Sequence, residues 1–460
     1  MANSGTYFVP SQLQGNIARI PCGHYKKRLF SFKRIRKVIH SRNKMQLLSL
    51  IVFLLVVLSV HGKAPIKPSE DAFYKLEAGF ESHVPGTILK SRLIPRSKTF
   101  TLFPTFPRNI KGAYQLLYRT TDALGNATAA VTTVLIPHNA DPKKLVSYQV
   151  IQDSTGLDCG FSYKIQNPIT KPDIVPQIET FFMDALLQRG WYVAAPDYEG
   201  LDSMFGVGRM AGHAVLDGIR AVLSSGEFTH IDPEAKAQLW GYSGGGLASG
   251  WAAQLHSTYA PELDIVGAVL AISGILGVAK QYKEFRDHMD ANLLPEKRAA
   301  FYNVSTLCYG TILQDYGFQD LKTYFTMPDY ANHPSLVPAV EANQMGHLVP
   351  SMPVFAYHAQ HDHVSPYEQA TQVFEQWCQG GASVELLTET SEDHAQLLFA
   401  AVPEAIMFLD QRFEGKPPSK TCTKRSTGNA YLDPGALKVV RQTWAAVFKA
   451  LLGIRGRKHH

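Results

Sequence analysis

The sequence predicts an α/β fold in which helices cover both faces of a mostly parallel β-sheet. Apolar runs of strand length recur along the chain, at 145–152, 191–200, 236–240, 263–273, 353–359 and 383–390. Helix-length patterns alternate with them, at 174–190, 211–225, 246–260 and 367–379. This alternation is typical of a parallel sheet with crossover helices. The composition, 45% hydrophobic and 18% charged over 460 residues, is that of an ordinary globular protein.

Three further stretches complete the predicted architecture. Apolar runs on either side of the turn "DALGN" predict a β-hairpin over 113–137, and a helix is expected over 395–413. The strand rhythm stops between 274 and 350, where the sequence predicts an inserted helical cap over the carboxyl ends of the strands. The core then comprises 63–273 and 351–415, and 416–460 is a C-terminal segment.

The amino-terminal region has the pattern of a secretion signal. Residues 1–44 form a basic extension, and 45–62 contain the fourteen-residue apolar run "LLSLIVFLLVVLSV". That run is short for a membrane span and has the length of a signal-peptide core. We therefore expect a secreted protein, with a retained membrane anchor at 47–60 as the alternative. The length of the extension leaves open whether translation starts at Met1 or Met45.

The net charge of +6 does not indicate binding to nucleic acid. Residues 1–62 hold ten lysines and arginines and no acidic residue, so the remainder, with 35 basic and 39 acidic residues, is mildly acidic. A basic surface for nucleic acid is therefore not expected. Separately, we expect the protein to be a monomer.

The cysteines agree with secretion. Four follow the signal segment, Cys159, Cys308, Cys378 and Cys422, and four cysteines allow three pairings. Two N-glycosylation triplets begin at Asn126 and Asn303.

One serine has the setting of a nucleophile. The stretch "GYSGG" places Ser243 between a predicted strand and a predicted helix, with Gly241 and Gly245 on either side. This is the strand–turn–helix elbow of the α/β-hydrolase fold, in which small residues let strand and helix approach closely. A phosphate-binding loop is the competing interpretation, but the stretch lacks the P-loop lysine and the dinucleotide glycine spacing.

A nucleophilic serine needs a base and an orienting acid. In this fold they follow in the order serine, acid, histidine, each after a strand. Asp362 follows the strand at 353–359 and His394 follows the strand at 383–390. Asp393 adjoins His394 in the chain and is expected to be a surface residue. Asp197 and Glu199 are interpreted as groups that stabilise a loop.

The stretch "HAQHDHV" also permits a metal site. It contains His358, His361, Asp362 and His363, but the spacing differs by one residue from the familiar hydrolase pattern and no second ligand cluster appears. We expect no metal and no cofactor.

Several long blocks resemble the secretory lipase family of fungi. They include "FYKLEAGFESHVPGTILKSR", "SYQVIQDST", "GWYVAAPDYEGLDSMFGVGRMAGHAVLDGIRA" and "GYSGG", and the resemblance runs from about Phe73 to Cys422. It implies a triad of Ser243, Asp362 and His394 and an oxyanion hole formed by the backbone N–H groups of Asp153 and Gly244. It also implies a helical cap and the disulfides Cys159–Cys308 and Cys378–Cys422. Gln152 departs from the family pattern, which has an acidic residue before the aspartate.

The resemblance implies a carboxylic ester hydrolase, and above all a triacylglycerol lipase that works at a lipid–water interface. A small-ester carboxylesterase, such as a deacetylase of fungal terpenoid toxins of the trichothecene type, is the alternative. A catalytically silent binding protein is a remote alternative.

Overall fold

The computed structural model describes residues 65–95, 109–166, 175–271, 278–317, 319–327, 333–419, 421–430, 435–436 and 438–439. All of them belong to the unit that spans residues 64–460. The predicted extension (1–44), the signal segment (45–62) and the first residues of the predicted cap (274–277) lie outside the described residues. Among the helices of the described part, none is both long and apolar enough to cross a membrane.

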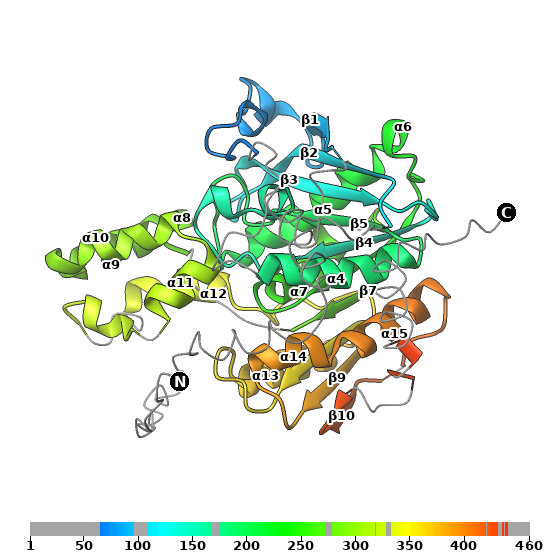
Figure 1. Cartoon of the computed structure of the whole chain (residues 1–460). Helices are drawn as coiled ribbons and strands as arrows, with labels where there is room; N and C mark the ends of the chain where they lie inside the picture. The colour runs from blue at the N-terminus through cyan, green and yellow to red at the C-terminus, as the bar shows by residue number, and fades with distance from the viewer. Residues whose placement is uncertain are drawn as a thin grey trace, which may run out of the picture. The chain divides into compact units, whose positions relative to one another are not determined.

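A ten-stranded sheet runs through the molecule in the order β1-β2-β3-β5-β4-β6-β7-β8-β9-β10 (Figure 1). The pairs β1–β2, β2–β3 and β3–β5 are antiparallel, and every later pair is parallel. The strands are β1 (Ile88–Leu93), β2 (Gly112–Thr121), β3 (Ala127–Ile136), β4 (Lys144–Gln149), β5 (Tyr192–Pro196), β6 (Lys236–Gly241), β7 (Ile265–Leu270), β8 (Val354–Ala359), β9 (Val384–Glu389) and β10 (Thr423–Thr427). The α/β class predicted from the sequence is therefore confirmed.

Helices cover both faces of this sheet. One apolar cluster joins it to α5 (Gly208–Leu223), α7 (Gly244–Tyr259) and α13 (Tyr367–Gln379). A second cluster joins its opposite face to α4 (Val175–Gln188), α14 (His394–Ala400) and α15 (Val402–Phe413). The central strands, such as β5 and β8, are buried along their whole length, as strands covered on both faces must be.

Shorter helices complete the part of the chain outside the insertion. They are α3 (Phe161–Lys164) and α6 (Gly226–Thr229), with single 3₁₀ turns at Ala72–Tyr74, Phe80–Ser82 and Leu157–Cys159.

The prediction of one continuous helix over 395–413 was wrong. The structure has two helices, α14 and α15, that meet at Ala401. Pro403 stands in the first turn of α15, where its missing N–H costs nothing, whereas the same proline inside one long helix would remove a hydrogen bond. The break leaves α14 as a short helix that begins at His394.

The stretch between β7 and β8 is helical, with α8 (Val278–Gln281), α9 (Lys283–Asn292), α10 (Pro295–Asn303), α11 (Tyr309–Tyr316) and α12 (Val337–Ala342). It also contains 3₁₀ turns at Val304–Thr306, Leu321–Tyr324 and Pro334–Leu336. We call its described residues between 278 and 350 the insertion. It has an apolar cluster of its own around Leu293, Tyr324 and Phe325. Its helices α8 to α11 form a lobe beside the sheet (Figure 1).

Candidate active site

Ser243 occupies a strained turn between β6 and α7. Its backbone has φ 54° and ψ −123°, a conformation that L-residues rarely adopt. A Cβ atom on Gly241 would lie 2.1 Å from the carbonyl oxygen of Gly245, and one on Gly245 would lie 2.0 Å from that of Gln149. The two glycines that the sequence analysis singled out therefore permit the close approach of strand and helix.

A hydrogen-bonded chain of three side chains converges on this turn. His394 Nε2 lies 3.0 Å from Ser243 Oγ, and His394 Nδ1 lies 2.6 Å from Asp362 Oδ2. The second oxygen of Asp362 accepts hydrogen bonds from the backbone N–H groups of Val364 and Ser365, at 2.8 and 2.7 Å. The structure thus brings together the serine, histidine and aspartate that the sequence had placed after three different strands.

The surroundings of Asp362 favour its charged form. Burial alone would raise the pKa of this carboxyl, but hydrogen bonds with His394 and with the N–H of Ser365 outweigh burial and lower the pKa below its ordinary value. An ionised carboxylate at Nδ1 fixes the imidazole so that Nε2 faces Ser243 as an acceptor.

Two neighbours of the triad in the chain hold His394 in place. The Tyr242 hydroxyl donates to the backbone carbonyl of His394 at 2.6 Å, and its ring stacks on Tyr357. Asp393 is exposed, and its side chain accepts a hydrogen bond from Gln396 N at 3.0 Å in a capping box at the start of α14. The hydroxyl contact of Tyr242 depends on tertiary structure that the sequence does not display.

The histidines of "HAQHDHV" do not gather around one point. His358 is buried, and its Nε2 donates to the carbonyl of Ser365 at 2.8 Å, whereas His361 and His363 are exposed. Burial lowers the pKa of His358, which favours its neutral form. Among the described residues, no group of three or more His, Cys, Asp or Glu side chains could hold a metal ion.

The predicted oxyanion residues face each other beside Ser243. Asp153 follows β4 with φ 39°, and Gly244 is the first residue of α7, where N–H groups have no acceptor within the helix. A Cβ atom on Gly244 would lie 1.8 Å from Asp153 Oδ1. Burial raises the pKa of Asp153 to about 7, although nearby His394 acts in the opposite direction.

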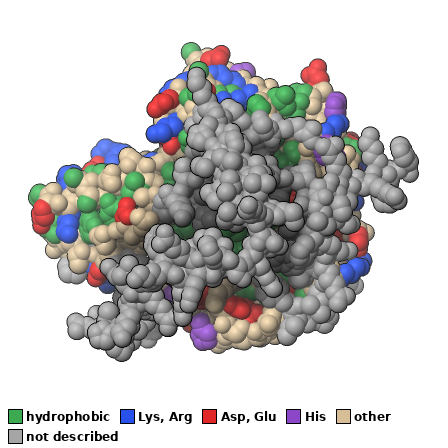
Figure 2. Space-filling view, in the orientation of Figure 1, with side chains coloured by type: hydrophobic (Ala, Val, Ile, Leu, Met, Phe, Trp, Pro, Cys, Tyr) green, Lys and Arg blue, Asp and Glu red, His purple; other side chains and the backbone are tan. Residues whose placement is uncertain are grey.

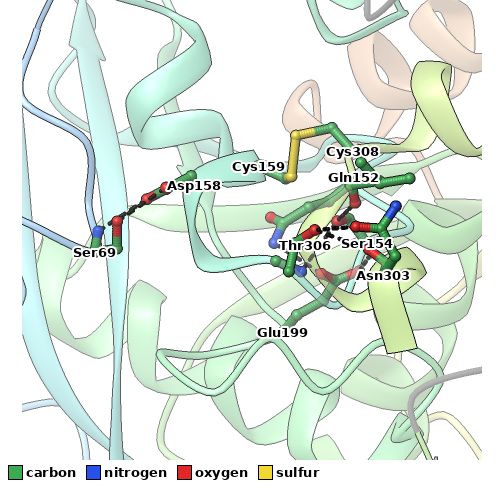
Figure 3. Close-up of a disulfide and its surroundings, with 11 residues drawn as sticks. Ser69, Gln152, Ser154, Asp158, Cys159, Glu199, Asn303, Thr306 and Cys308 are labelled. Carbon is green, nitrogen blue, oxygen red and sulfur yellow. Dashed lines mark hydrogen bonds between the residues drawn. A yellow bond between two sulfur atoms is a disulfide. The ribbon is translucent and has the colours of Figure 1, made fainter. Parts of the chain in front are cut away.

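The insertion is joined to the loop that follows Asp153. The structure pairs Cys159 with Cys308, and Ser154 Oγ donates to the carbonyl of Leu307 at 2.8 Å (Figure 3). Lys280 Nζ donates to the carbonyl of Thr155 at 2.6 Å. These three links come from two separate parts of the insertion, so the loop and the insertion are held together.

The second disulfide lies elsewhere in the fold. It joins Cys378 at the end of α13 to Cys422 just before β10. The glycosylation candidates Asn126 and Asn303 are both exposed, Asn126 in the turn of the β2–β3 hairpin and Asn303 at the end of α10.

Comparison with known proteins agrees with this fold and site. The secretory lipase family matches over residues 165–421. Lipase A of Arthroderma benhamiae is 34% identical over 430 residues, covering 87% of this chain and 91% of that protein. Lipase 5 of Candida albicans is 37% identical, covering 82% and 87%. The crystal structure of Candida antarctica lipase A in its closed state has a TM-score of 0.74 at 26% identity, covering 83% and 96%.

The fold defines an α/β hydrolase, and the relatives define the class as carboxylic ester hydrolases. The chain belongs to the secretory lipase family, as its sequence had indicated. Membership of this family implies an extracellular enzyme.

Proposed function

We propose that the protein hydrolyses acylglycerol esters through an acyl-enzyme on Ser243. The observation that carries the proposal is the hydrogen-bonded chain from Ser243 through His394 to Asp362 on a strained strand–helix turn. His394 takes the proton of Ser243 as its oxygen attacks the ester carbonyl, and then gives that proton to the departing alcohol. Water hydrolyses the acyl-enzyme with His394 again as the base.

The N–H groups of Asp153 and Gly244 are proposed as the donors to the oxyanion. Each such donor is worth roughly 2.7–4 kcal/mol in the transition state. The mutual approach of these two residues beside the nucleophile supports this assignment.

The insertion is proposed as a cap that shapes the acyl site. The enzyme is proposed to act at a lipid–water interface. Burial of Tyr309, on α11, raises the pKa of its hydroxyl to about 12, and the negative charge of Asp153 adds to this effect. Other apolar side chains of the insertion are exposed, namely Tyr302, Leu313, Met327, Val337 and Val340. Figure 2 shows hydrophobic side chains among the charged ones on the lobe. The proposal also includes cleavage of the signal at 45–62 and a monomeric enzyme.

The nucleophile is tested by Ser243→Ala. We expect turnover of p-nitrophenyl esters to fall by about a millionfold, as loss of a catalytic serine does, while the melting temperature stays near that of the wild type. Residual activity within tenfold of the wild type would show that another residue attacks.

The acyl preference is tested with p-nitrophenyl esters from acetate to palmitate, together with an emulsified triacylglycerol. A lipase hydrolyses the long-chain esters and the emulsion. A profile that peaks at acetate would replace the lipase proposal with a small-ester esterase.

A further inference from the structure

Asp153 needs support from its surroundings. A non-glycine residue at φ 39° persists only where neighbouring structure holds it there. Its own Oδ1 is buried without a hydrogen-bond partner. The residues on either side of it make hydrogen bonds that restrain the backbone at this point.

One carboxyl group contacts both of these neighbours. Gln152 Nε2 donates to Glu199 Oε2 at 2.8 Å, and the N–H of Ser154 points at Glu199 Oε1 at 3.4 Å (Figure 3). Glu199 follows β5, the strand beside β4, and its side chain is buried, with 1% of the residue exposed. A carboxyl group from one loop thus bridges across Asp153 in the next loop.

The surroundings of Glu199 disfavour the charged form of its carboxyl group. The charges of Asp153 and Asp197 act on it. Glu199 in turn acts on Lys280, whose Nζ donates hydrogen bonds to the carbonyls of Thr155 and Asp202. Burial, together with repulsion by Asp153, holds the pKa of Glu199 well above its ordinary value. An amide at position 152 donates to this carboxyl group in either protonation state, so the contact does not depend on pH.

We propose that Gln152 and Glu199 are positioning residues that hold the backbone N–H of Asp153 in the oxyanion hole. The inference deepens the proposed function and rests on it. Gln152 and Glu199 touch no reacting atom, and act only by fixing the conformation of the residue between Gln152 and Ser154. Because the donor is needed most in the transition state, their loss lowers kcat more than it changes KM.

The pair offers a test by exchange. Gln152→Glu places two carboxyl groups at hydrogen-bond distance, and such a pair is held together only while it shares a proton. Relative to the wild type, we expect kcat for a p-nitrophenyl ester to fall by about tenfold or more as the pH rises from 5 to 8. KM should change by no more than about threefold. The double variant Gln152→Glu/Glu199→Gln restores one amide and one carboxyl, and we expect its kcat and pH profile to return to within about threefold of the wild type.

Gln238→Glu is the matched control. Gln238 lies on β6 and is also buried, and its Nε2 donates to the carbonyl of Leu409 on α15. We expect this variant to lose stability as pH rises without a change in the kcat of the folded enzyme.

A Gln152→Glu enzyme with the pH profile of the wild type overturns the inference, as does an exchanged pair that regains its melting temperature but not kcat. If Gln152→Glu does not fold, Gln152→Leu removes the donor without adding charge. It should then lower kcat by about tenfold with KM unaltered. An unchanged kcat would also refute the inference that Gln152 and Glu199 position Asp153. Activity in Ser243→Ala would instead refute the proposed function, so the two failures are distinct.

Discussion

At the scale of single residues, the absence of a side chain at Gly244 is a feature of the site beside the triad. Gly244 is helical, so alanine there strains no backbone angle, and the whole effect of a methyl group would come from contact with Asp153 Oδ1 at 1.8 Å. Asp153 would have to give way to this methyl group, and the proposed oxyanion donor is the backbone N–H of the same residue.

We expect Gly244→Ala to lower kcat by about a hundredfold, the loss seen when one oxyanion donor is removed. Its cost in stability should be about 1–3 kcal/mol, typical of overpacking. Gly250→Ala on the same helix is the control, because its methyl group would meet only the flexible end of Met345. Steady-state kinetics and thermal melts of both variants check this prediction. Equal kcat values in the two variants would show that Asp153 is not part of the oxyanion hole.

The residues that support the site show what a sequence can and cannot display. Ser243, Asp362 and His394 follow recognisable strands, so their meeting at one sheet edge could be predicted. The contact between Gln152 and Glu199 depends on β5 lying next to β4, and strand order is not encoded in hydrophobic periodicity. Glu199 was therefore interpreted as a loop-stabilising residue, and the sequence did not show that its partner Gln152 adjoins Asp153.

At the scale of elements, the two disulfides constrain different parts of the fold. Cys159–Cys308 closes a separation of 149 residues and joins the loop after Asp153 to the insertion. Cys378–Cys422 closes 44 residues and joins α13 to the residue just before β10. The chain-entropy model gives upper figures of about 5 and about 4 kcal/mol for the two. Their effects on stability should be similar and their effects on the site should differ.

We expect Cys159→Ser/Cys308→Ser to lower the melting temperature and to broaden the range of acyl chains hydrolysed, with the triad still active. Cys378→Ser/Cys422→Ser should lower the melting temperature alone. Chain-length profiles of both double variants, measured below their melting temperatures, test this. A profile that broadens equally in both would mean that the first disulfide has no particular effect on the acyl site.

The strands at the two edges of the sheet were the hardest elements to predict. β1 is only partly buried, and β10 carries the polar sequence "TKRST", so neither has the apolar pattern of a core strand. Lys424 of β10 pairs with Glu375, and Arg425 pairs with Glu404. Charges of this kind suit an edge strand, where they discourage pairing with another chain, but they hide the strand in a sequence.

At the scale of the whole molecule, buried carboxyl groups set how stability depends on pH. Burial raises the pKa of Asp197 to about 6, that of Asp153 to about 7 and that of Glu179 to about 8. Each binds its proton more tightly in the folded state, so each loses stabilisation as pH rises from about 4, the unfolded value, to its folded pKa. Buried His213 has a pKa of about 4, so its contribution to stability grows as the pH rises from 4 to 6.5. This single group is outweighed by the three carboxyl groups.

We therefore expect the melting temperature to be several degrees higher at pH 5 than at pH 8, because 1 kcal/mol corresponds to about 2 °C in a large domain. Below about pH 4 the stability falls again, because Asp362 and Asp122 have lowered pKa values and lose their favourable charge. Glu179→Gln should narrow the difference between pH 5 and pH 8, as seen by differential scanning calorimetry. A wild-type enzyme that is more stable at pH 8 would contradict this ordering.

The insertion has a consequence for how such enzymes diversify. It forms a single stretch between β7 and β8 and has an apolar cluster of its own, while Ser243, Asp362 and His394 all lie outside it. Substitutions in this one stretch can therefore change the proposed cap without replacing Ser243, Asp362 or His394. Its links to the rest of the protein include Lys280, Leu307 and Cys308, and also Asn343 and Gly346, which are hydrogen-bonded to Gly208 and Gln254.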